Sequence, residues 1–309
     1  MMSMKNWDLI KTNGAPNARH ENGFAEFGGK FYVFGSRRIQ PTNIYDPKTN
    51  TWTNASPPPM EIHHFQPVII GDEIWLLGTM TGEFPREVPL KTVYIYHPAT
   101  DTWKEGPEIP QARRRGGAGC ALHTDGWIYV VGGIIDGHHS GTQSWFDRIN
   151  PATGEWQILP DTLHKRDHAP AAIVDNKLYF LAGRETGRHN GTNYDDVFTA
   201  VISEVDCYDF ATSTWSTCDQ PIPIPTAAGG MGIIDGKIYY AGGETGRPEA
   251  YTETQVFDPK TGNWSTHSHL NEQRHGTNAL VYDNAMWIAV GSGARGGEPE
   301  LVSLEKFQF

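Results

Sequence analysis

The phrase YDPKTNTW at residues 45–52 recurs in variant form along the chain, and this repetition decides the fold. The later copies are YHPATDTW (96–103), INPATGEW (149–156), YDFATSTW (208–215) and FDPKTGNW (257–264). The copies carry turn-forming residues between extended segments, because proline presets φ and the side-chain oxygens of Asp and Thr bond nearby amides. Their tryptophans are 49 to 59 residues apart, so we expect one supersecondary unit repeated along the chain.

A second hairpin precedes each copy, and a sixth such hairpin lies near the C-terminus. Its two-residue turn consists of Gly, Asp or Asn, which tolerate the positive φ angles of tight hairpins. These turns are Gly28-Gly29, Gly71-Asp72, Asp125-Gly126, Asp175-Asn176, Asp235-Gly236 and Asp283-Asn284. The strand after each turn is apolar and aromatic and ends in glycine, as in FYVFG (31–35). Each unit therefore holds four antiparallel strands.

The two ends of the chain supply the missing sixth copy. The 45 residues after Trp264 and the segment up to Trp7 together have the length of one more unit. We therefore expect a strand near Trp7 to complete a unit whose other three strands are C-terminal. Such closure requires a ring, so we predict an all-β single domain over residues 1–309. It would be a six-bladed β-propeller, in which strand edges are short and protected.

Two glycine doublets, Gly132-Gly133 and Gly242-Gly243, follow second strands, and each unit has a tryptophan further on. This pattern resembles the kelch-repeat family across essentially the whole chain. The other four units depart from the doublet and have Gly35-Ser36, Gly78-Thr79, Gly183-Arg184 and Gly291-Ser292. The resemblance implies the propeller fold. It leaves function open, because kelch propellers include enzymes, lectin-like proteins and protein-binding adaptors.

Composition excludes several classes of function. The 25 Lys and Arg against 36 Asp and Glu give a net charge of −11, so we expect no binding to nucleic acid or to anionic membranes. No apolar stretch reaches the 18 residues of a membrane span, and the start lacks a signal-peptide core. We expect a soluble protein, either cytoplasmic or secreted or periplasmic after signal removal. Cys207 and Cys218 flank a hairpin turn, and unpaired cysteines are expected over a disulfide.

Arginines gather on one face of the expected ring. In an antiparallel blade with strands a to d, the b–c and d–a connections lie on one face, and 13 of the 14 arginines map there. A guanidinium suits carboxylate, sulfate or phosphate, so we predict a mouth that binds a small anionic ligand, such as a uronate or sialate. Internal ion pairs between blades are the alternative. The ligand-binding candidates are Arg19, Arg115, Arg166, Arg184, Arg247, Arg274, Arg295, His138 and Trp145.

Three residues are candidates for catalysis, although turnover itself stays open. Glu244 directly follows a strand b glycine, a position that resembles the catalytic-type Glu of bacterial N-acetylneuraminate epimerases. Arg247 follows at a shorter spacing than in that family. A carboxylate near His168 or His275 could also abstract a proton next to a carboxylate. The resemblance thus implies a sugar-acid epimerase or mutarotase, and the chemistry alone also allows a lyase.

Metals, cofactors and protein partners complete the expectations. We expect no cofactor and no metal site, because strand alternation points the side chains of adjacent histidines such as His138-His139 to opposite faces. A site with one histidine from each of several blades stays open, since spacing does not test it. The alternative function is a protein-interaction propeller that recognises an acidic peptide. The oligomeric state is open.

Overall fold

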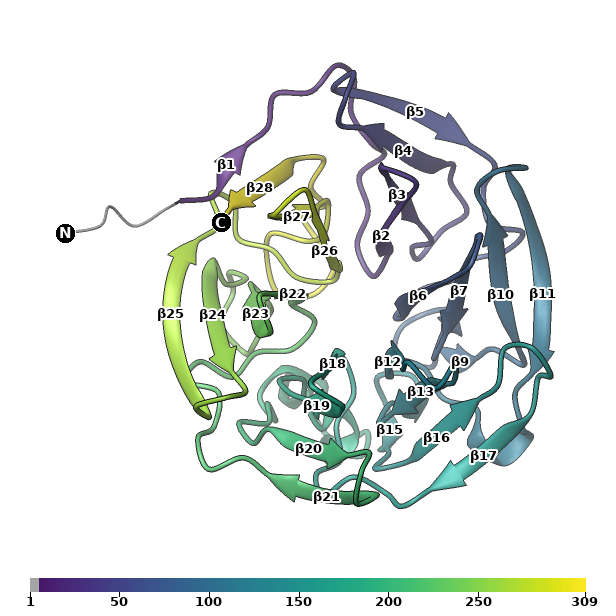
Figure 1. Ribbon diagram of the computed structural model, residues 1–309, viewed down its shortest axis with the longest axis vertical. Helices are drawn as coiled ribbons and strands as arrows, with labels where there is room; N and C mark the ends of the chain where they lie inside the picture. The colour runs from purple at the N-terminus through teal and green to yellow at the C-terminus, as the bar shows by residue number, and fades with distance from the viewer. Residues whose placement is uncertain (1–5) are drawn as a thin grey trace.

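The computed structural model describes residues 6–309 and arranges them as a ring of six four-stranded sheets, or blades (Figure 1). The first three blades are β2 (Gly23–Phe27), β3 (Lys30–Phe34), β4 (Thr42–Asp46), β5 (Thr51–Ala55); β6 (Gln66–Ile70), β7 (Glu73–Leu77), β10 (Thr92–His97), β11 (Thr102–Glu108); and β12 (Gly119–Leu122), β13 (Ile128–Val131), β16 (Phe146–Ile149), β17 (Trp156–Leu159). The last three are β18 (Ala171–Val174), β19 (Lys177–Phe180), β20 (Asp206–Asp209), β21 (Thr214–Thr217); β22 (Gly230–Ile234), β23 (Lys237–Ala241), β24 (Glu253–Asp258), β25 (Asn263–His269); and β26 (Ala279–Tyr282), β27 (Ala285–Ala289), β28 (Leu304–Gln308), β1 (Asp8–Leu9). The predicted all-β six-bladed propeller is confirmed.

The N-terminal strand closes the last blade, as expected. Strand β1 pairs antiparallel with β28, with Asp8 opposite Lys306 (Figure 1). Trp7 precedes β1, is 2% exposed, and donates its indole N–H to Thr254 Oγ1 of blade 5 at 2.9 Å. The chain ends are therefore joined by both a strand pair and a buried aromatic side chain. The predicted domain begins at residue 1, and residues 1–5 lie outside the described residues.

The predicted two-residue turns connect the first two strands in five of the six blades. In blade 3 the prediction of Asp125-Gly126 is wrong, because β12 ends at Leu122 and β13 begins at Ile128, and the Gly126 N–H donates to the His123 carbonyl. Both central residues have positive φ at Gly28-Gly29, Asp175-Asn176, Asp235-Gly236 and Asp283-Asn284. This conformation matches the right-handed twist of the strands that the turn joins. Because these turns are short, the face that carries them has little surface with which to build a site.

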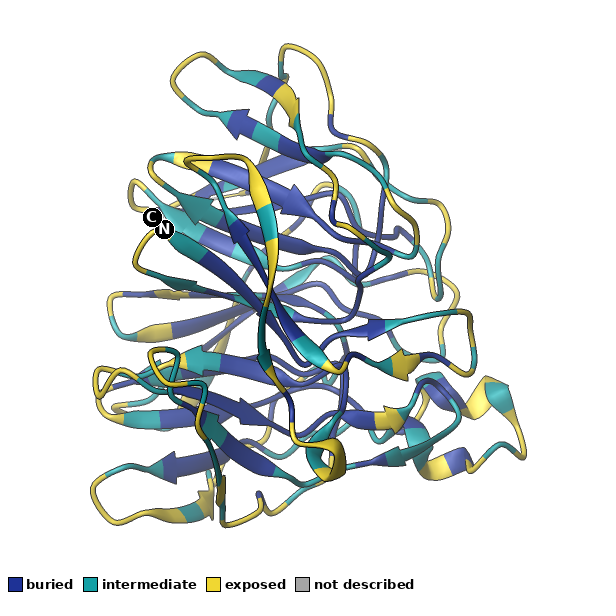
Figure 2. Cartoon of the chain, turned by 90° about the vertical axis from the view of Figure 1, so that its right-hand side faces the viewer, coloured by how far each residue is buried: buried dark blue, intermediate teal, exposed yellow. Residues whose placement is uncertain are grey.

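The hydrophobic core lies between neighbouring blades. Phe31 of blade 1 meets Trp287 of blade 6 edge to face, with ring centroids 5.0 Å apart, and Tyr45 and Trp52 pack beside them. Buried strands run through the middle of each blade while exposed residues gather in the connections at the edges (Figure 2). Aromatic burial of this kind contributes most of the favourable free energy of a blade-to-blade contact.

A closed ring of six backbone hydrogen bonds surrounds the axis, just before the first strand of each blade. Its members are Glu21, His64, Gly117, His168, Ala228 and Gly276, which we call the axial ring. Each residue donates its N–H to the carbonyl of the member in the preceding blade, at 2.6 to 3.1 Å. All six have φ between 52° and 66°, in the left-handed region. The axial ring therefore places one residue of every blade beside the channel axis.

The glycine doublets are required by close approach of the next blade. Gly132 has φ 65°, and a Cβ there would lie 2.4 Å from the Arg166 carbonyl oxygen. Gly242 meets the carbonyl of Arg274 in the same way, at 2.3 Å. The second glycine of each doublet donates its N–H to that same carbonyl. The doublet thus serves as a tight joint between adjacent blades.

The opposite face carries the longer connections, and we call it the loop face. It holds the hairpins β8 (Met80–Thr81) with β9 (Val88–Pro89) and β14 (Ile134–Asp136) with β15 (Ser140–Thr142), and the 3-10 helices η1 (Gln111–Arg113), η2 (Thr186–His189) and η3 (Tyr194–Phe198). These segments raise one side of the rim in blades 2 to 4. Within residues 6–309, none of the helices has the length and apolar character needed to cross a membrane.

Candidate functional site

Four of the arginines proposed as ligand-binding residues occupy one equivalent position in their blades. They stand two residues before an axial-ring member and are almost fully buried: Arg19, Arg115, Arg166 and Arg274. Each donates to a carbonyl at the end of its blade's second strand and to a polar side chain on the third strand. They lie in four separate blades and do not converge on a common ligand.

Arg166 illustrates the arrangement. Its guanidinium donates to the carbonyls of Ala182 and Glu204 and to Asp206 Oδ2, at 3.1, 2.8 and 2.9 Å. Both members of the Arg166–Asp206 pair are 0% exposed. Burial lowers the pKa of Arg166, while Asp206 opposes this effect. In the structure these four arginines therefore connect the second and third strands of their own blade. The sequence alternative was ion pairs between neighbouring blades, whereas the observed pairs lie within one blade.

A second network joins three other predicted residues. Arg184, 1% exposed, donates to Glu244 Oε1 at 2.5 Å, and its guanidinium lies over the ring of Phe198. The other oxygen of Glu244 accepts from the Gly296 amide at 2.9 Å and lies 3.4 Å from His275 Nε2. Burial alone raises the pKa of Glu244, but His275, Arg184 and the amide hold it at about 2. Glu244 and His275 therefore meet, with the carboxylate ionised.

The remaining candidates are spread around the loop face. Arg247 is exposed and lies over the Tyr251 ring at 3.3 Å, while Arg295 is exposed and donates to the Gly246 carbonyl. Trp145 is half-buried and carries the guanidinium of Arg113 on its face, at 4.4 Å from the ring centroid. Arg295 thus lies beside the segment of Arg247, and its guanidinium also lies 5.2 Å from the Phe198 ring centroid, next to the Arg184 network. Trp145 lies apart from both, beside Arg113 and Arg115.

A cavity of about 470 Å³ opens on the loop face, and we call it the mouth cavity. Its lining residues are His20, Glu21, Arg37, Arg38, Phe84, His138, Phe198, Glu244, Gly296, Gly297, Glu298 and Glu300. This volume is in the usual range for small-molecule sites. Two arginines face four carboxylates there, so the lining is mixed in charge rather than basic as the arginine distribution had suggested.

Ion pairs fix the rim of the mouth cavity on one side. His20 Nδ1 lies 2.7 Å from Glu300 Oε1, and both carboxylate oxygens of Glu300 accept from Arg38. Burial would raise the pKa of Glu300, but His20 and Arg38 hold it at about 2. The Arg38 side chain remains 50% exposed, so a ligand can still reach it.

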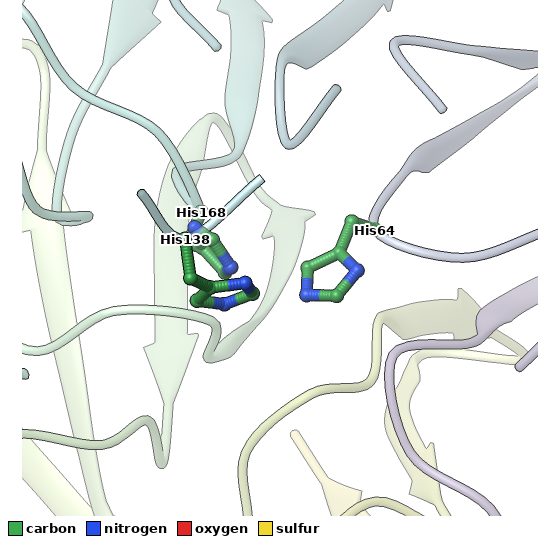
Figure 3. A group of neighbouring side chains, drawn as sticks. All are labelled: His64, His138 and His168. Carbon is green, nitrogen blue, oxygen red and sulfur yellow. The ribbon is translucent and has the colours of Figure 1, made fainter. Parts of the chain in front are cut away.

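The floor of the mouth cavity holds a group of three buried histidines from three blades, His64, His138 and His168, which we call the histidine cluster. One nitrogen of each ring lies within 4.8 Å of the corresponding nitrogens of the other two. His64 faces the other two rings across a gap (Figure 3). His64 and His168 belong to the axial ring, and His138 descends from the β14–β15 hairpin.

A smaller cavity of about 60 Å³ continues down the axis, below the histidine cluster. His64 and His168 line this smaller cavity, His138 lines the mouth cavity, and Glu21 lines both. The cluster therefore lies at the junction between the mouth and the channel.

Sequence reasoning included His138 and His168 among the candidates but missed His64, Glu21 and Glu87. The side chains of His138 and His139 do part, as expected: His139 turns away to Tyr194 and Arg86, whereas His138 faces the axis. The expectation is wrong for the adjacent His63 and His64, whose Nδ1 atoms lie 2.5 Å apart, because His64 has a positive φ of 57° and strand alternation does not apply there. A single histidine from each of three blades was the pattern left open. The recurring position two residues after a buried arginine was a signal for His168, but not for His64, since Ile62 stands where the arginine would be.

Comparison with known proteins settles the family. The family model described as the KLHDC2/KLHL20/DRC7 Kelch-repeats domain matches residues 68–291. The chain belongs to the kelch-repeat family. This confirms the resemblance drawn from the glycine doublets and the tryptophan phrases.

Relatives include Kelch-like protein terF of Aspergillus terreus, 32% identical over 300 residues that cover 91% of this chain and 63% of that protein. Human Kelch-like protein 23 is 23% identical, over 95% of this chain and 49% of that protein. The chain thus spans about half to two thirds of the length of these relatives. A solved structure titled "Structure of YjhT" superposes with a TM-score of 0.78 at 15% identity, covering 96% of this chain and 97% of the other. That likeness concerns the fold alone.

Proposed function

We propose that this kelch propeller binds a small polyhydroxylated ligand with one acid group, of the uronate or sialate type, in the mouth cavity. The observation that carries the proposal is the composition of the cavity lining. Phe84 is 51% exposed at one wall, and its ring can stack on the apolar face of a sugar. The half-buried Phe198, whose ring lies beside the Arg184 and Arg295 guanidinium groups, adds apolar surface at another wall. Glu298 and Glu300 supply oxygens that accept hydrogen bonds from hydroxyl groups.

The acid group of the ligand would be recognised by Arg37 and Arg38. Arg37 already donates to Glu87 Oε1 at 2.6 Å, which holds its guanidinium at the cavity wall. Arg38 is the more accessible of the two. The buried Arg19, Arg115, Arg166 and Arg274 are left out of this proposal because their donors are directed within their own blades.

Calorimetric titration of the full chain with sialate, galacturonate, glucuronate and their neutral parent sugars tests the proposal. We expect binding of at least one acid and at least tenfold weaker binding of its neutral parent. Phe84→Ala and Arg38→Gln should each weaken that binding at least tenfold. Arg188→Gln is the matched control, since Arg188 is an exposed arginine of η2 outside the lining of the mouth cavity. No binding by any member of the panel refutes the proposal.

Turnover is read in the same samples by NMR. If Glu244 removes a proton from a carbon of the bound acid, incubation in D₂O replaces the proton on that carbon by deuterium. Glu244→Gln should abolish this exchange and leave binding within about threefold. Binding without any exchange or anomeric interconversion assigns a lectin-like role and excludes the epimerase and lyase chemistry considered for Glu244, His168 and His275.

Recognition of an acidic peptide of a partner protein is the second candidate, and the kelch-like relatives favour it over a sugar acid. A specific observation supports it: exposed apolar side chains project from the loop-face connections of blades 1 to 3. They are Ile39, Phe84, Val88 and Ile135, at 41% to 59% exposure. Titration with acidic peptides that contain one apolar anchor distinguishes the candidates. Ile39→Ser should weaken binding of a peptide and leave binding of a sugar unchanged, because Ile39 is not among the lining residues of the mouth cavity.

A further inference from the structure

We propose that the histidine cluster binds one divalent transition-metal ion, Zn²⁺ in the first place, at the junction of the mouth cavity and the axial channel. This inference goes beyond ligand binding in the mouth cavity and does not depend on it. The ligands would be one nitrogen each of His64, His138 and His168. Imidazole suits zinc, copper, iron and nickel, and three histidines with a fourth open position are one of the arrangements of catalytic zinc.

The three rings converge as a ligand set should. Their centroids are 4.9 to 5.2 Å apart in all three pairs. Tetrahedral zinc with bonds of about 2.0–2.1 Å needs nitrogens roughly 3.4 Å apart, so nitrogens that now lie up to 4.8 Å apart would approach by as much as about 1.4 Å on binding. The Nε2 atoms of His64 and His168 are buried and have no hydrogen-bond partner among the described residues. Leaving such an atom unsatisfied costs about 1–3 kcal/mol, and a bound ion removes that cost.

The far nitrogen of each ring is held by a second residue, which is the usual pattern behind metal-binding histidines. Asp167 Oδ1 lies 2.5 Å from Nδ1 of His168, and Glu87 Oε1 lies 2.8 Å from Nδ1 of His138. With its N–H on Nδ1, each of these two histidines carries its lone pair on Nε2, which is then the nitrogen that can bind an ion.

The far nitrogen of His64, Nδ1, is held by a neighbouring histidine and, through it, by a carboxylate. Its Nδ1 lies 2.5 Å from Nδ1 of His63, and Nε2 of His63 lies 3.1 Å from Glu61 Oε1. His64 can therefore donate from Nδ1 to His63, which in turn donates from Nε2 to the carboxylate.

The backbone also carries a cost at these positions. His64 and His168 have φ of 57° and 52°, although glycine occupies the equivalent places at Gly117 and Gly276. A non-glycine residue in this region is strained by about 1–3 kcal/mol, and such strain tends to gather at functional sites. The axial ring thus holds two imidazoles beside the axis at the expense of stability.

One side of the cluster stays accessible to a ligand. His138 lines the mouth cavity, and Glu21 Oε2 lies 3.4 Å from His64 Nε2. A fourth coordination position on this side would admit water or an oxygen of a ligand, with the Glu21 carboxylate next to it. An ion there adds two positive charges to the floor of a cavity whose lining is rich in carboxylates.

The test is metal binding by the full chain, stripped with a chelator and dialysed. We expect one equivalent of Zn²⁺ by elemental analysis, with a sub-micromolar Kd and a higher Tm after loading. Co²⁺ should give the intense visible absorption of a four- or five-coordinate site, and one equivalent of Zn²⁺ should remove it. Both readouts use the unaltered chain, so they do not depend on the folding of a variant.

Variants assign the ligands. His64→Ala and His168→Ala should each lower Zn²⁺ affinity at least 100-fold and abolish the Co²⁺ band, while Glu87→Gln should lower affinity 10- to 100-fold through His138. His269→Ala is the control, because His269 is exposed on β25. Absence of Zn²⁺ uptake and of the Co²⁺ band in the unaltered chain overturns the proposal. Equal Zn²⁺ affinity in the unaltered chain and the His64 and His168 variants overturns it as well.

Discussion

Replacing Arg166 by alanine should cost stability rather than ligand binding. The guanidinium is fully buried and makes an ion pair with Asp206 and hydrogen bonds with two carbonyls. Removing it leaves Asp206 with only His164, Thr162 and Thr217 as side-chain partners within residues 6–309. Breaking a buried ion pair by loss of one member costs about 3–5 kcal/mol. At about 2.1 cal/mol/K of unfolding entropy per residue over 309 residues, this loss lowers Tm by roughly 5–8 °C.

Differential scanning calorimetry and urea unfolding of Arg166→Ala measure the loss directly. Arg188→Ala is the matched control: the Arg188 side chain is 68% exposed and pairs only with Glu185 among the described residues, so its loss should stay within about 0.5 kcal/mol. A fall in Tm of less than about 2 °C for Arg166→Ala, or one no larger than in the control, contradicts the blade-tying role. Unchanged stability together with lost ligand binding would instead restore the binding role first expected for this arginine.

Three further predictions concern the closure of the ring, the blade joints and Glu244. Trp7→Ala should destabilise the fold by about 3–5 kcal/mol in urea unfolding, because it empties a buried aromatic site at the closure of the ring. Gly132→Ala should lower the unfolding free energy by more than 1 kcal/mol, since its Cβ would meet the next blade at 2.4 Å, whereas Gly262→Ala, with nothing within 4 Å, isolates the cost of positive φ alone. The pKa of Glu244 is depressed from 4.5 to about 2, so its stabilisation is present above pH 4.5 and is lost as the pH falls towards 2. The free energy of unfolding in urea should therefore fall more steeply between pH 7 and 3 in the unaltered chain than in Glu244→Gln, by about 2 kcal/mol of the roughly 3 kcal/mol expected for the full titration.

The architecture could be read from the sequence because it depends on local rules. A turn such as Asp235-Gly236 needs positive φ, and a phrase such as FDPKTGNW ends in the half-buried Trp264. Each unit can therefore be recognised without reference to the others. Closure of the ring by the segment at Trp7 followed from counting residues alone. These features depend on backbone conformation and on the burial of large side chains, which sequence patterns report well.

The site could be read only in part, because it depends on where side chains from different blades point. Arg166 and Arg38 have the same chemistry and the same expected face, yet one is sealed within a blade and the other lines a cavity. The difference arises from a partner on the third strand, Asp206, some 40 residues away. His64 likewise meets His138 and His168 only through the curvature of the ring, which no spacing along the chain records.

The axial ring has a consequence for how this fold can change its chemistry. Its six hydrogen bonds use only backbone atoms, so the side chain at each member is not needed to hold the blades in place. Glu21, His64, Gly117, His168, Ala228 and Gly276 therefore occupy six equivalent positions around one axis whose side chains can vary. A single substitution at one of these positions changes the groups that meet at the axis, while the blades keep their register. New active centres can thus be assembled on this scaffold one blade at a time, by evolution or by design.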